Sequence, residues 1–428
     1  MKRFIIATTA FLCYLGVNAQ NFDSYFEDNT LRIDYTFSGD SASQKIYLDE
    51  LNKTPGWAGR RVRLDKLPLL GNGQLYVRDA KTDSVIYETS FSTLFQEWQT
   101  TKEATQVQKS FENVFQVPFP KNPVKITVEL LNTHHKKTAT FTHFVDPKDI
   151  LIRRQGFEAN LITPHKYLWK GGDTKDCIDV AILAEGYTKD EMQTFYNDAQ
   201  TAIDQILLHE PFKTYKNRFN FVAVASASSD SGVSNPKEGK WISTAMGSHF
   251  DTFYSDRYLT TLHLKNVNDL LSGIPYEHII ILANTAEYGG GGIYNSYTLT
   301  TAHHPLFKPV VVHEFGHSFG GLADEYFYDD QYSTFYPSDT EPWEQNITTL
   351  HDFASKWKSM LPKGTPIPTK ADGKGIYTKI GVYEGGGYQS KGVYRAYQEC
   401  RMKINEAPAF CPVCKNALAH LIKFYTDK

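Results

Sequence analysis

The chain has little cysteine, little methionine and no excess of charge of either sign. Only 5 of its 428 residues are Cys and 5 are Met, and 45 Lys and Arg stand against 48 Asp and Glu, which leaves a formal net charge of −3. A near-neutral chain without a long run of Lys or Arg lacks the basic surface that attracts nucleic acids or anionic membranes. We therefore expect no nucleic-acid partner.

Long apolar runs are also scarce, and the one at the N-terminus is short. It covers residues 4–17, follows Lys2 and Arg3, and leads into a small-residue segment that closes with Ala19. These three features are typical of a secretory signal peptide, and the run is too short to span a bilayer with margin. We expect residues 1–19 to be removed between Ala19 and Gln20, which leaves a secreted, periplasmic or cell-surface protein without a transmembrane segment.

What the chain does have is a globular composition rich in aromatic residues. Hydrophobic residues make up 41%, charged residues 22% and aromatic residues 14%, which suits packed sheets and not a disordered chain. Residues 20–149 contain short stretches of alternating polar and apolar side chains, separated by Gly, Asn and Asp, as antiparallel strands with tight turns do. We expect an antiparallel β-sandwich domain there, with strands at residues 30–37, 61–64, 74–77, 124–130 and 138–141.

The pattern changes in the second domain, which we place at residues 150–428. Three stretches in it are largely apolar, as buried strands are, at residues 178–183, 219–224 and 278–283. Between the first two, Thr188 and Glu191 have capping-box spacing, which predicts a helix that ends near His209. This order indicates helices packed on a mixed or parallel sheet, so the fold class that we expect is α+β.

One short motif carries most of the chemistry. The chain reads HEFGH from His313 to His317. On a helix the two imidazoles lie one turn apart on the same face, so both can bind one metal ion. Glu314, next to the first histidine, is placed to hold a metal-activated water and act as the general base. The five-residue motif arises by chance in roughly one chain in forty of this length, so its surroundings matter.

The residues after the motif supply a third ligand candidate. Gly320 and Gly321 predict the end of the helix, and Asp324 follows three residues later. Glu325 is the alternative, but on an extended return segment its side chain points elsewhere, so Asp324 is preferred. Two imidazoles and one carboxylate suit Zn²⁺ and leave a fourth position open for water, as catalytic zinc sites require.

Two resemblances extend this interpretation. The two histidines, the glycine and Met402, about eighty residues later, resemble the metzincins, in which a Met-turn lies below the metal. The strict metzincin pattern has a histidine ten residues after the first, where this chain has Ala323. The string HEFGHSFGGLADEY, residues 183–187 and residues 399–414 together resemble the bacterial IgA-peptidase family of zinc metallopeptidases, from about residue 171 to the C-terminus.

The resemblance implies a metzincin-like zinc-peptidase domain with a mixed sheet, an active-site helix and a Met-turn. It implies His313, His317 and Asp324 as zinc ligands, Glu314 as the general base and Met402 as the Met-turn residue. The expected activity is that of an exported endopeptidase acting on extracellular proteins or glycoproteins, although the family name does not transfer a substrate. Two alternatives stay open: a catalytically silent zinc-containing surface binding protein, which the intact Glu314 disfavours, and a zinc hydrolase of non-peptide substrates.

Four cysteines remain after removal of the signal segment: Cys177, Cys400, Cys411 and Cys414. An even number in an exported protein permits disulfides, and four cysteines allow three pairings. The CxxC pair at 411 and 414 suits half of a zinc knuckle, a redox pair or a disulfide partner. Because the chain has no second CxxC, we favour a disulfide between this pair and Cys400.

Two glycine-rich segments are candidates for the walls of the site. Residues 289–292 precede a strand predicted near 297–300 and suit either an edge where a substrate peptide adds as a strand or a flexible hairpin loop. Residues 385–388 lie among several tyrosines, one of which could stabilise an oxyanion. The sequence does not single out that group.

Overall fold

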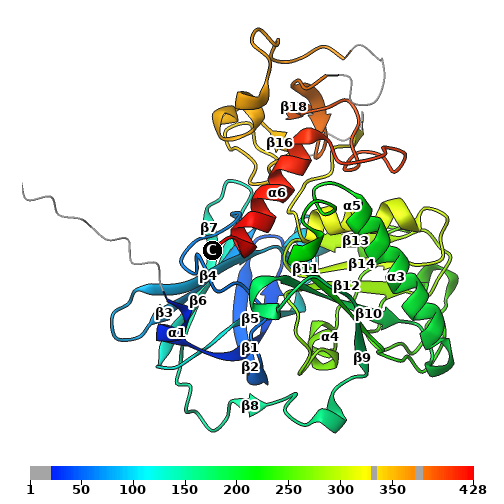
Figure 1. Ribbon diagram of the computed structural model, residues 1–428. Coiled ribbons are helices and arrows are strands. Elements are labelled where there is room, and N and C mark those ends of the chain that lie inside the picture. Colours follow the sequence, from blue (N-terminus) through cyan, green and yellow to red (C-terminus); the bar gives the residue numbers. More distant parts are fainter. Residues whose placement is uncertain (1–20, 329–334, 372–378) are drawn as a thin grey trace, which may run out of the picture.

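The computed structural model describes residues 21–328, 335–371 and 379–428. The predicted signal segment and its junction at Ala19 and Gln20 lie outside these ranges and stay a prediction. Within the ranges, no helix has the combined length and apolar character that a membrane span requires. Figure 1 shows a β-rich N-terminal part in blue and cyan, a sheet with helices in green, and a C-terminal layer in orange and red.

Two four-stranded sheets form the N-terminal part, with strand orders β5-β1-β2-β8 and β4-β3-β6-β7. Their inner faces pack together: the ring centroids of Phe91 and Phe115 are 4.3 Å apart, and the Tyr35 hydroxyl lies 2.6 Å from His143 Nε2. This agrees with the expected N-terminal β-domain. The strands are β1 (Phe26–Gly39), β2 (Gln44–Pro55), β3 (Gly73–Asp79), β4 (Val85–Phe91), β5 (Lys109–Pro120), β6 (Val124–Leu131), β7 (Lys137–Val145) and β8 (Arg153–Arg154), with the short helices α1 (Phe22–Tyr25) and α2 (Leu94–Trp98).

Four of the five predicted strands lie within β1, β3, β6 and β7, and the fifth, at residues 61–64, is wrong. That segment is a loop, and Arg63 has a φ of 49° in the left-handed region. The guanidinium group of Arg60 donates hydrogen bonds to the carbonyls of Arg63 at 3.3 Å, Leu64 at 3.4 Å and Lys66 at 3.0 Å. These bonds satisfy backbone groups that a strand would have paired in a ladder.

The second sheet system has six strands in the order β13-β14-β12-β10-β11-β9. Its centre is parallel, since β10 pairs with β11 and β12, and β12 with β14. The predicted strands are confirmed as β10, β11 and β12, all of whose residues are buried. The predicted capping box of Thr188 and Glu191 is present ahead of α3. The elements are β9 (His165–Lys170), β10 (Ile178–Glu185), α3 (Met192–Leu208), β11 (Phe219–Val224), α4 (Leu264–Leu270), β12 (His278–Ala283), β13 (Gly290–Ile293) and β14 (Tyr297–Thr301).

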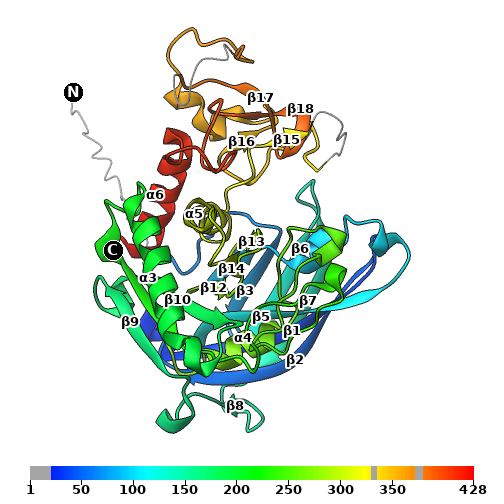
Figure 2. The same cartoon turned by 90° about the vertical axis from the view of Figure 1, so that its right-hand side faces the viewer.

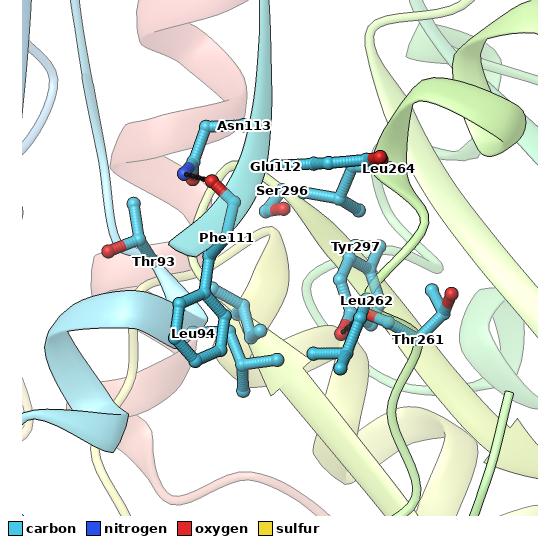
Figure 3. A pocket seen from close by; sticks show the side chains of 11 residues that line it. Thr93, Leu94, Phe111, Glu112, Asn113, Thr261, Leu262, Leu264, Ser296 and Tyr297 are labelled. Atoms are coloured by element: carbon cyan, nitrogen blue, oxygen red, sulfur yellow. Dashed lines mark hydrogen bonds between the residues drawn. The ribbon is translucent and has the colours of Figure 1, made fainter. Parts of the chain in front are cut away.

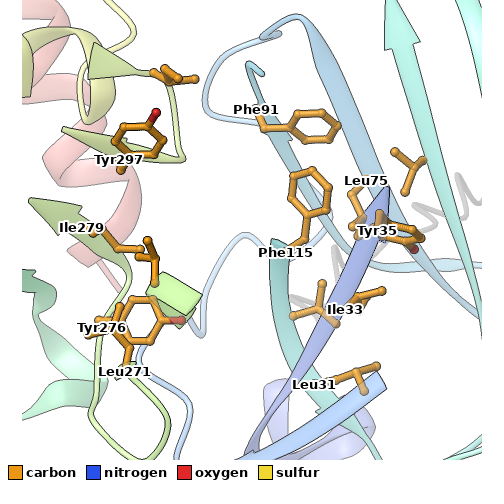
Figure 4. Packing of buried hydrophobic residues seen from close by; sticks show 14 of the residues in the cluster. Leu31, Ile33, Tyr35, Leu75, Phe91, Phe115, Leu271, Tyr276, Ile279 and Tyr297 are labelled. Carbon is orange, nitrogen blue, oxygen red and sulfur yellow. The ribbon is translucent and has the colours of Figure 1, made fainter. Parts of the chain in front are cut away.

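The six-stranded sheet has a different partner on each face. Alternate side chains such as Leu183 and Val222 join the core of the N-terminal sheets, and the others, such as Ile182, pack with the helices. Figure 4 shows side chains of the N-terminal sheets on one side of this shared core, facing Tyr276 and Ile279 on the other. The N-terminal part is therefore packed against the back of the sheet that carries the site.

A hollow lies at the same junction (Figure 3). Thr93, Phe111 and Asn113 line it from the N-terminal part, and Thr261 and Tyr297 from the other. None of the predicted metal ligands or the predicted general base lines this hollow. It is a gap between packed domains, and the candidate site lies elsewhere.

The C-terminal layer covers the helix that bears the HEFGH motif. Helix α5 lies between this layer and the six-stranded sheet, against β13 and β14 (Figure 2). Strand β18 pairs with β15, β16 and β17, and the last helix returns to the body of the molecule. The elements are α5 (Phe307–Ser318), β15 (Phe327–Tyr328), β16 (Ile347–Thr348), β17 (Tyr383–Gly386), β18 (Tyr388–Arg395) and α6 (Pro412–Thr426).

A buried acid in β10 gives the fold a pH dependence. Asp179 is 0% exposed, and burial raises its pKa from 3.8 to about 7, against a hydrogen bond that Asn220 donates. Between these two pH values the folded chain keeps a proton that the unfolded chain loses, so the free energy of unfolding falls as pH rises from about 4 to 7. We expect Asp179→Asn to remove this pH-dependent fall in the free energy of unfolding, which amounts to roughly a few kcal/mol.

Thermal unfolding at pH 4, 5.5 and 8 checks this expectation. The variant should unfold at about the same temperature as the unmodified chain at pH 4 and at a higher temperature at pH 8. Asp173→Asn, at an exposed position nearby, is the matched control and should show no such divergence. Equal melting differences at all three pH values would contradict the assignment.

Candidate active site and metal centre

Helix α5 carries both predicted histidine ligands and then turns the chain back on itself. The helix ends at Ser318, and Gly321 follows with a φ of 56°, a conformation that glycine adopts without steric cost. Two backbone bonds close this turn, from Gly321 N–H to the His317 carbonyl at 2.9 Å and from Leu322 N–H to the Gly316 carbonyl at 3.1 Å. As predicted, the double glycine ends the helix and brings Asp324 back toward it.

Three donor atoms converge in front of the helix. The Nε2 atoms of His313 and His317 are 3.0 Å apart, and Asp324 Oδ1 lies 3.1 Å from the first and 3.2 Å from the second. Zinc–nitrogen and zinc–oxygen bonds of about 2.0–2.1 Å in a tetrahedron place neighbouring donors about 3.3 Å apart. The three atoms thus have the spacing of three corners of such a tetrahedron.

The rings are oriented so that their lone pairs face this centre. His313 Nδ1 lies 2.8 Å from the carbonyl oxygen of Arg401, and His317 Nδ1 lies 2.5 Å from that of Leu322. A carbonyl only accepts hydrogen bonds, so each Nδ1 carries a proton, and in the neutral rings, the form that binds metals, each Nε2 presents its lone pair. Three acceptor atoms therefore face one another, an arrangement that a bound cation stabilises.

The electrostatics of the cluster agree with this conclusion. Asp324 is 7% exposed, yet the two imidazoles overcome its burial and hold the pKa of its carboxyl far below the usual range. Burial lowers the pKa of His317, but the charge of Asp324 outweighs it and raises the value to about 9. The cluster thus favours a positive charge at its centre, and its donor set fits a zinc ion.

Glu314 lies next to this centre, against the glycine-rich strand β13. A Cβ atom at Gly290 would lie 3.1 Å from Glu314 Oε1, and one at Gly292 would lie 2.3 Å from the Glu314 carbonyl oxygen. The second distance excludes any side chain, so glycine is required for β13 to pack this closely on α5. Burial raises the pKa of Glu314, and the neighbouring imidazoles partly offset the change.

Met402 packs against helix α5 at Gly316. Its side chain is 0% exposed, and a Cβ atom at Gly316 would lie 2.8 Å from its Sδ atom. Gly316 lies between the two histidines on α5, so its missing side chain makes room for the methionine. The preceding residue, Arg401, supplies the carbonyl that orients His313.

Comparison with known families agrees with the resemblance. Residues 167–376 match the model of the family described as IgA Peptidase M64, and residues 21–142 match the one described as Peptidase M64 N-terminus. The chain belongs to the IgA peptidase M64 family. It is therefore a peptidase, and proteins or peptides are its substrates. A search of curated proteins found no match.

Tyrosines line the carboxylate side of the centre in this M64 peptidase. The hydroxyl of Tyr388 donates a short hydrogen bond to Asp324 Oδ2, and its ring contacts that of Tyr326 at a centroid distance of 5.2 Å. The bond leaves Oδ1 for the metal. The sequence marked the tyrosine-rich segment around residue 388 as a wall but gave no sign that Asp324 is the partner.

The N-terminal domain of the M64 peptidase contributes a carboxyl group, Glu97, that the sequence did not point to. Glu97 of α2 accepts a hydrogen bond from Tyr258, and its charge interacts with Asp324 and His317. Its side chain reaches solvent, but the protein around it removes enough water to raise its pKa to about 7. Only the fold brings residue 97 to the site, so no local motif could have identified it.

The glycine-rich segment predicted as a substrate edge is β13, the edge strand of the six-stranded sheet. The outer edge of β13 is already partly paired. Gly290 forms a parallel bridge with Tyr258, and the Gly290 N–H lies 3.4 Å from the Arg257 carbonyl. The segment is thus not a flexible loop. Addition of a substrate strand along it stays a prediction for the residues beyond the bridge.

The predicted disulfide is wrong. All four described cysteines are free and buried, and the sulfur atoms of Cys400 and Cys414 are 3.7 Å apart. Glu325, the alternative metal ligand, points away from the histidines, and its Oε1 lies 3.2 Å from Cys414 Sγ. Asp324 and Glu325 therefore point to different clusters, as expected for neighbouring residues of an extended segment.

Proposed function

We propose that this chain is an exported, zinc-dependent endopeptidase in which His313, His317 and Asp324 hold the ion and Glu314 is the general base. The observation that carries the proposal is the triangle of donor atoms with edges of 3.0, 3.1 and 3.2 Å. Its three protein ligands leave a fourth position for water or substrate, which distinguishes catalytic from structural zinc sites.

A zinc ion bound there would lower the pKa of the attacking water and polarise the scissile carbonyl. The protein's own contribution is orientation and proton transfer. The carbonyls of Arg401 and Leu322 fix the two rings, and Tyr388 fixes the carboxylate of Asp324. Glu314 takes a proton from the attacking water and returns it to the leaving amine, the two roles that one carboxylate fulfils in peptide hydrolysis.

We further propose that the domain is metzincin-like, with residues 400–402 as its Met-turn. The packing of Met402 under α5 supports this, as does the bond from His313 to the neighbouring Arg401 carbonyl. Asp324 replaces the third histidine of the strict pattern. A carboxylate keeps the ligand count at three and lowers the net charge of the occupied centre by one.

The experiment that tests the function is a digestion of a proteome-derived peptide library by the mature protein. We expect new peptide termini that disappear with a chelator and return when zinc is added back. A catalytically silent binding protein would yield no new termini with or without zinc. A zinc hydrolase of non-peptide substrates would leave the library intact while hydrolysing small esters or amides in a parallel assay.

Export rests on the N-terminal sequence alone. The basic start, the apolar run over residues 4–17 and the small residues before Gln20 support a cleaved signal peptide. N-terminal sequencing of the protein recovered outside the cytoplasm should start at or near Gln20. A chain that begins at Met1 in that fraction would contradict the proposal.

A further inference from the structure

A second cluster of metal-ligating groups lies behind the active site. It contains Cys400, Cys411, Cys414 and Glu325, whose ligand atoms all lie within 4.8 Å of one another. The three thiols and the carboxylate are each 0% exposed. No step of the proposed peptide hydrolysis uses any of them.

The distances in this cluster suit a metal better than a disulfide. The Sγ atom of Cys414 lies 3.7 Å from that of Cys400 and 3.5 Å from that of Cys411. A disulfide requires sulfur atoms about 2.05 Å apart. Thiolates at tetrahedral positions around zinc, with bonds of about 2.3 Å, lie about 3.8 Å from one another. The observed spacing is close to the second value.

The carboxylate provides an independent reason. Glu325 Oε1 accepts a hydrogen bond from Asn346 at 3.0 Å and lies 3.2 Å from Cys414 Sγ. Its other oxygen, Oε2, is buried and has no hydrogen-bond partner among the described residues. A buried carboxylate oxygen without a partner is unfavourable. A cation among the three sulfur atoms would supply the missing interaction.

The backbone around the cysteines is arranged to stabilise thiolates. Cys411 is the N-cap of α6, and Cys414 lies in its first turn. Backbone N–H groups point at sulfur, from Cys411 to Cys400 Sγ at 3.1 Å and from Cys414 to Cys411 Sγ at 3.5 Å. A helix N-terminus and N–H donors both favour the negatively charged thiolate, which is the form that binds metals.

We propose that Cys400, Cys411, Cys414 and Glu325 bind a second, structural zinc ion. Three thiolates and one carboxylate occupy all four tetrahedral positions, and their complete burial leaves no opening for water or substrate. Soft thiolate ligands with tetrahedral spacing favour zinc over magnesium or calcium. On binding, the three thiols release their protons to solvent, and no oxidant or reductant is needed.

The ion would hold together three segments that support the active site. Glu325 follows Asp324 directly, and its backbone N–H donates to the carbonyl of Met402 at 2.7 Å. Cys400 directly precedes Arg401, whose carbonyl orients His313. Helix α6 contributes the other two cysteines. The second ion is thus placed to fix the Asp324 loop and the segment at 400–402 relative to each other.

The test counts metal and thiols in the purified mature protein after loading with zinc. We expect two zinc ions per chain by mass spectrometry of the metal, and no disulfide among Cys400, Cys411 and Cys414 by peptide mapping. The double variant H313A/H317A should keep one zinc ion per chain. Loss of both zinc ions from this variant would overturn the proposal. A disulfide within the cysteine cluster of the zinc-loaded protein would also overturn it.

Substitution of cysteine gives the complementary result. Cys414→Ser should lower the content to one ion while Cys177→Ser, which alters a buried thiol outside the cluster, should leave two. If Cys414→Ser does not fold, cobalt loading of H313A/H317A replaces it. A sulfur-to-cobalt charge-transfer band then supports the thiolate site, and its absence overturns it. These readouts do not depend on peptidase activity, so a failure of the proposed function leaves them interpretable.

Discussion

Replacing Glu314 with Gln is expected to slow peptide hydrolysis by roughly 10²–10⁴-fold and to leave the zinc content unchanged. The amide has nearly the shape of the carboxylate, so it fits in the narrow space beside Gly290. It cannot accept a proton from water, so the general base is lost. Glu314 is not one of the three converging donors, and metal affinity should therefore be preserved.

The measurement is kcat/KM on one peptide identified in the library digestion, together with zinc per chain. Glu406→Gln makes the same chemical change at an exposed position near the Met402 segment, and it should keep full activity. More than about a tenth of the normal rate in Glu314→Gln would show that another group is the base. Loss of zinc from the variant would instead make Glu314 part of the metal site.

Removal of the Asp324 carboxylate should abolish activity through loss of the metal. We expect Asp324→Ala to weaken zinc binding at the active site by more than the 10–100-fold that outer-shell substitutions cost, because a direct ligand disappears. Tyr388→Phe is the graded comparison. It removes only the hydrogen bond to Asp324 Oδ2, so it should weaken zinc binding by about 10–100-fold.

Competition with a chelator of known affinity measures both effects. The order of affinity should be the unmodified chain, then Tyr388→Phe, then Asp324→Ala. Glu325→Ala is the positional comparison: its carboxylate points at the cysteines, so it should lose the ion proposed for the cysteine cluster and keep the active-site ion. The ligand assignment would move to Glu325 if Asp324→Ala bound the active-site zinc normally while Glu325→Ala lost it.

Local signals predicted the parts of this fold that depend on local physics. The apolar stretches at 178–183, 219–224 and 278–283 were predicted as largely buried strands and are strands, and the Thr188 capping box marks the start of the following helix. The strand prediction at 61–64 failed because the polar positions of its alternation are Arg61 and Arg63, whose hydrogen bonds to the carbonyls of Trp57 and Phe424 are invisible in the sequence. Strands β2, β4 and β5 went unpredicted because their long-range pairing, not their pattern, defines them.

The same division applies to the site. The histidines, Glu314 and the glycine turn follow from spacing along one helix, and Asp324 follows from that turn. Contacts between residues far apart in the sequence could not be predicted from such local spacing. Tyr388 meets Asp324 across 64 positions, and Glu97 comes from the other domain. The cysteine spacing suggested a disulfide because sequence does not show that Glu325 joins the three thiols.

The support of both imidazoles by main-chain oxygens has a consequence for how the site tolerates mutation. The acceptors belong to Arg401 and Leu322, but the atoms used are carbonyls that every amino acid possesses. A change of side chain at either position leaves the acceptor in place, so no single codon change can delete it. The orientation of the two rings therefore depends on the path of the backbone and not on which amino acids occupy these two positions.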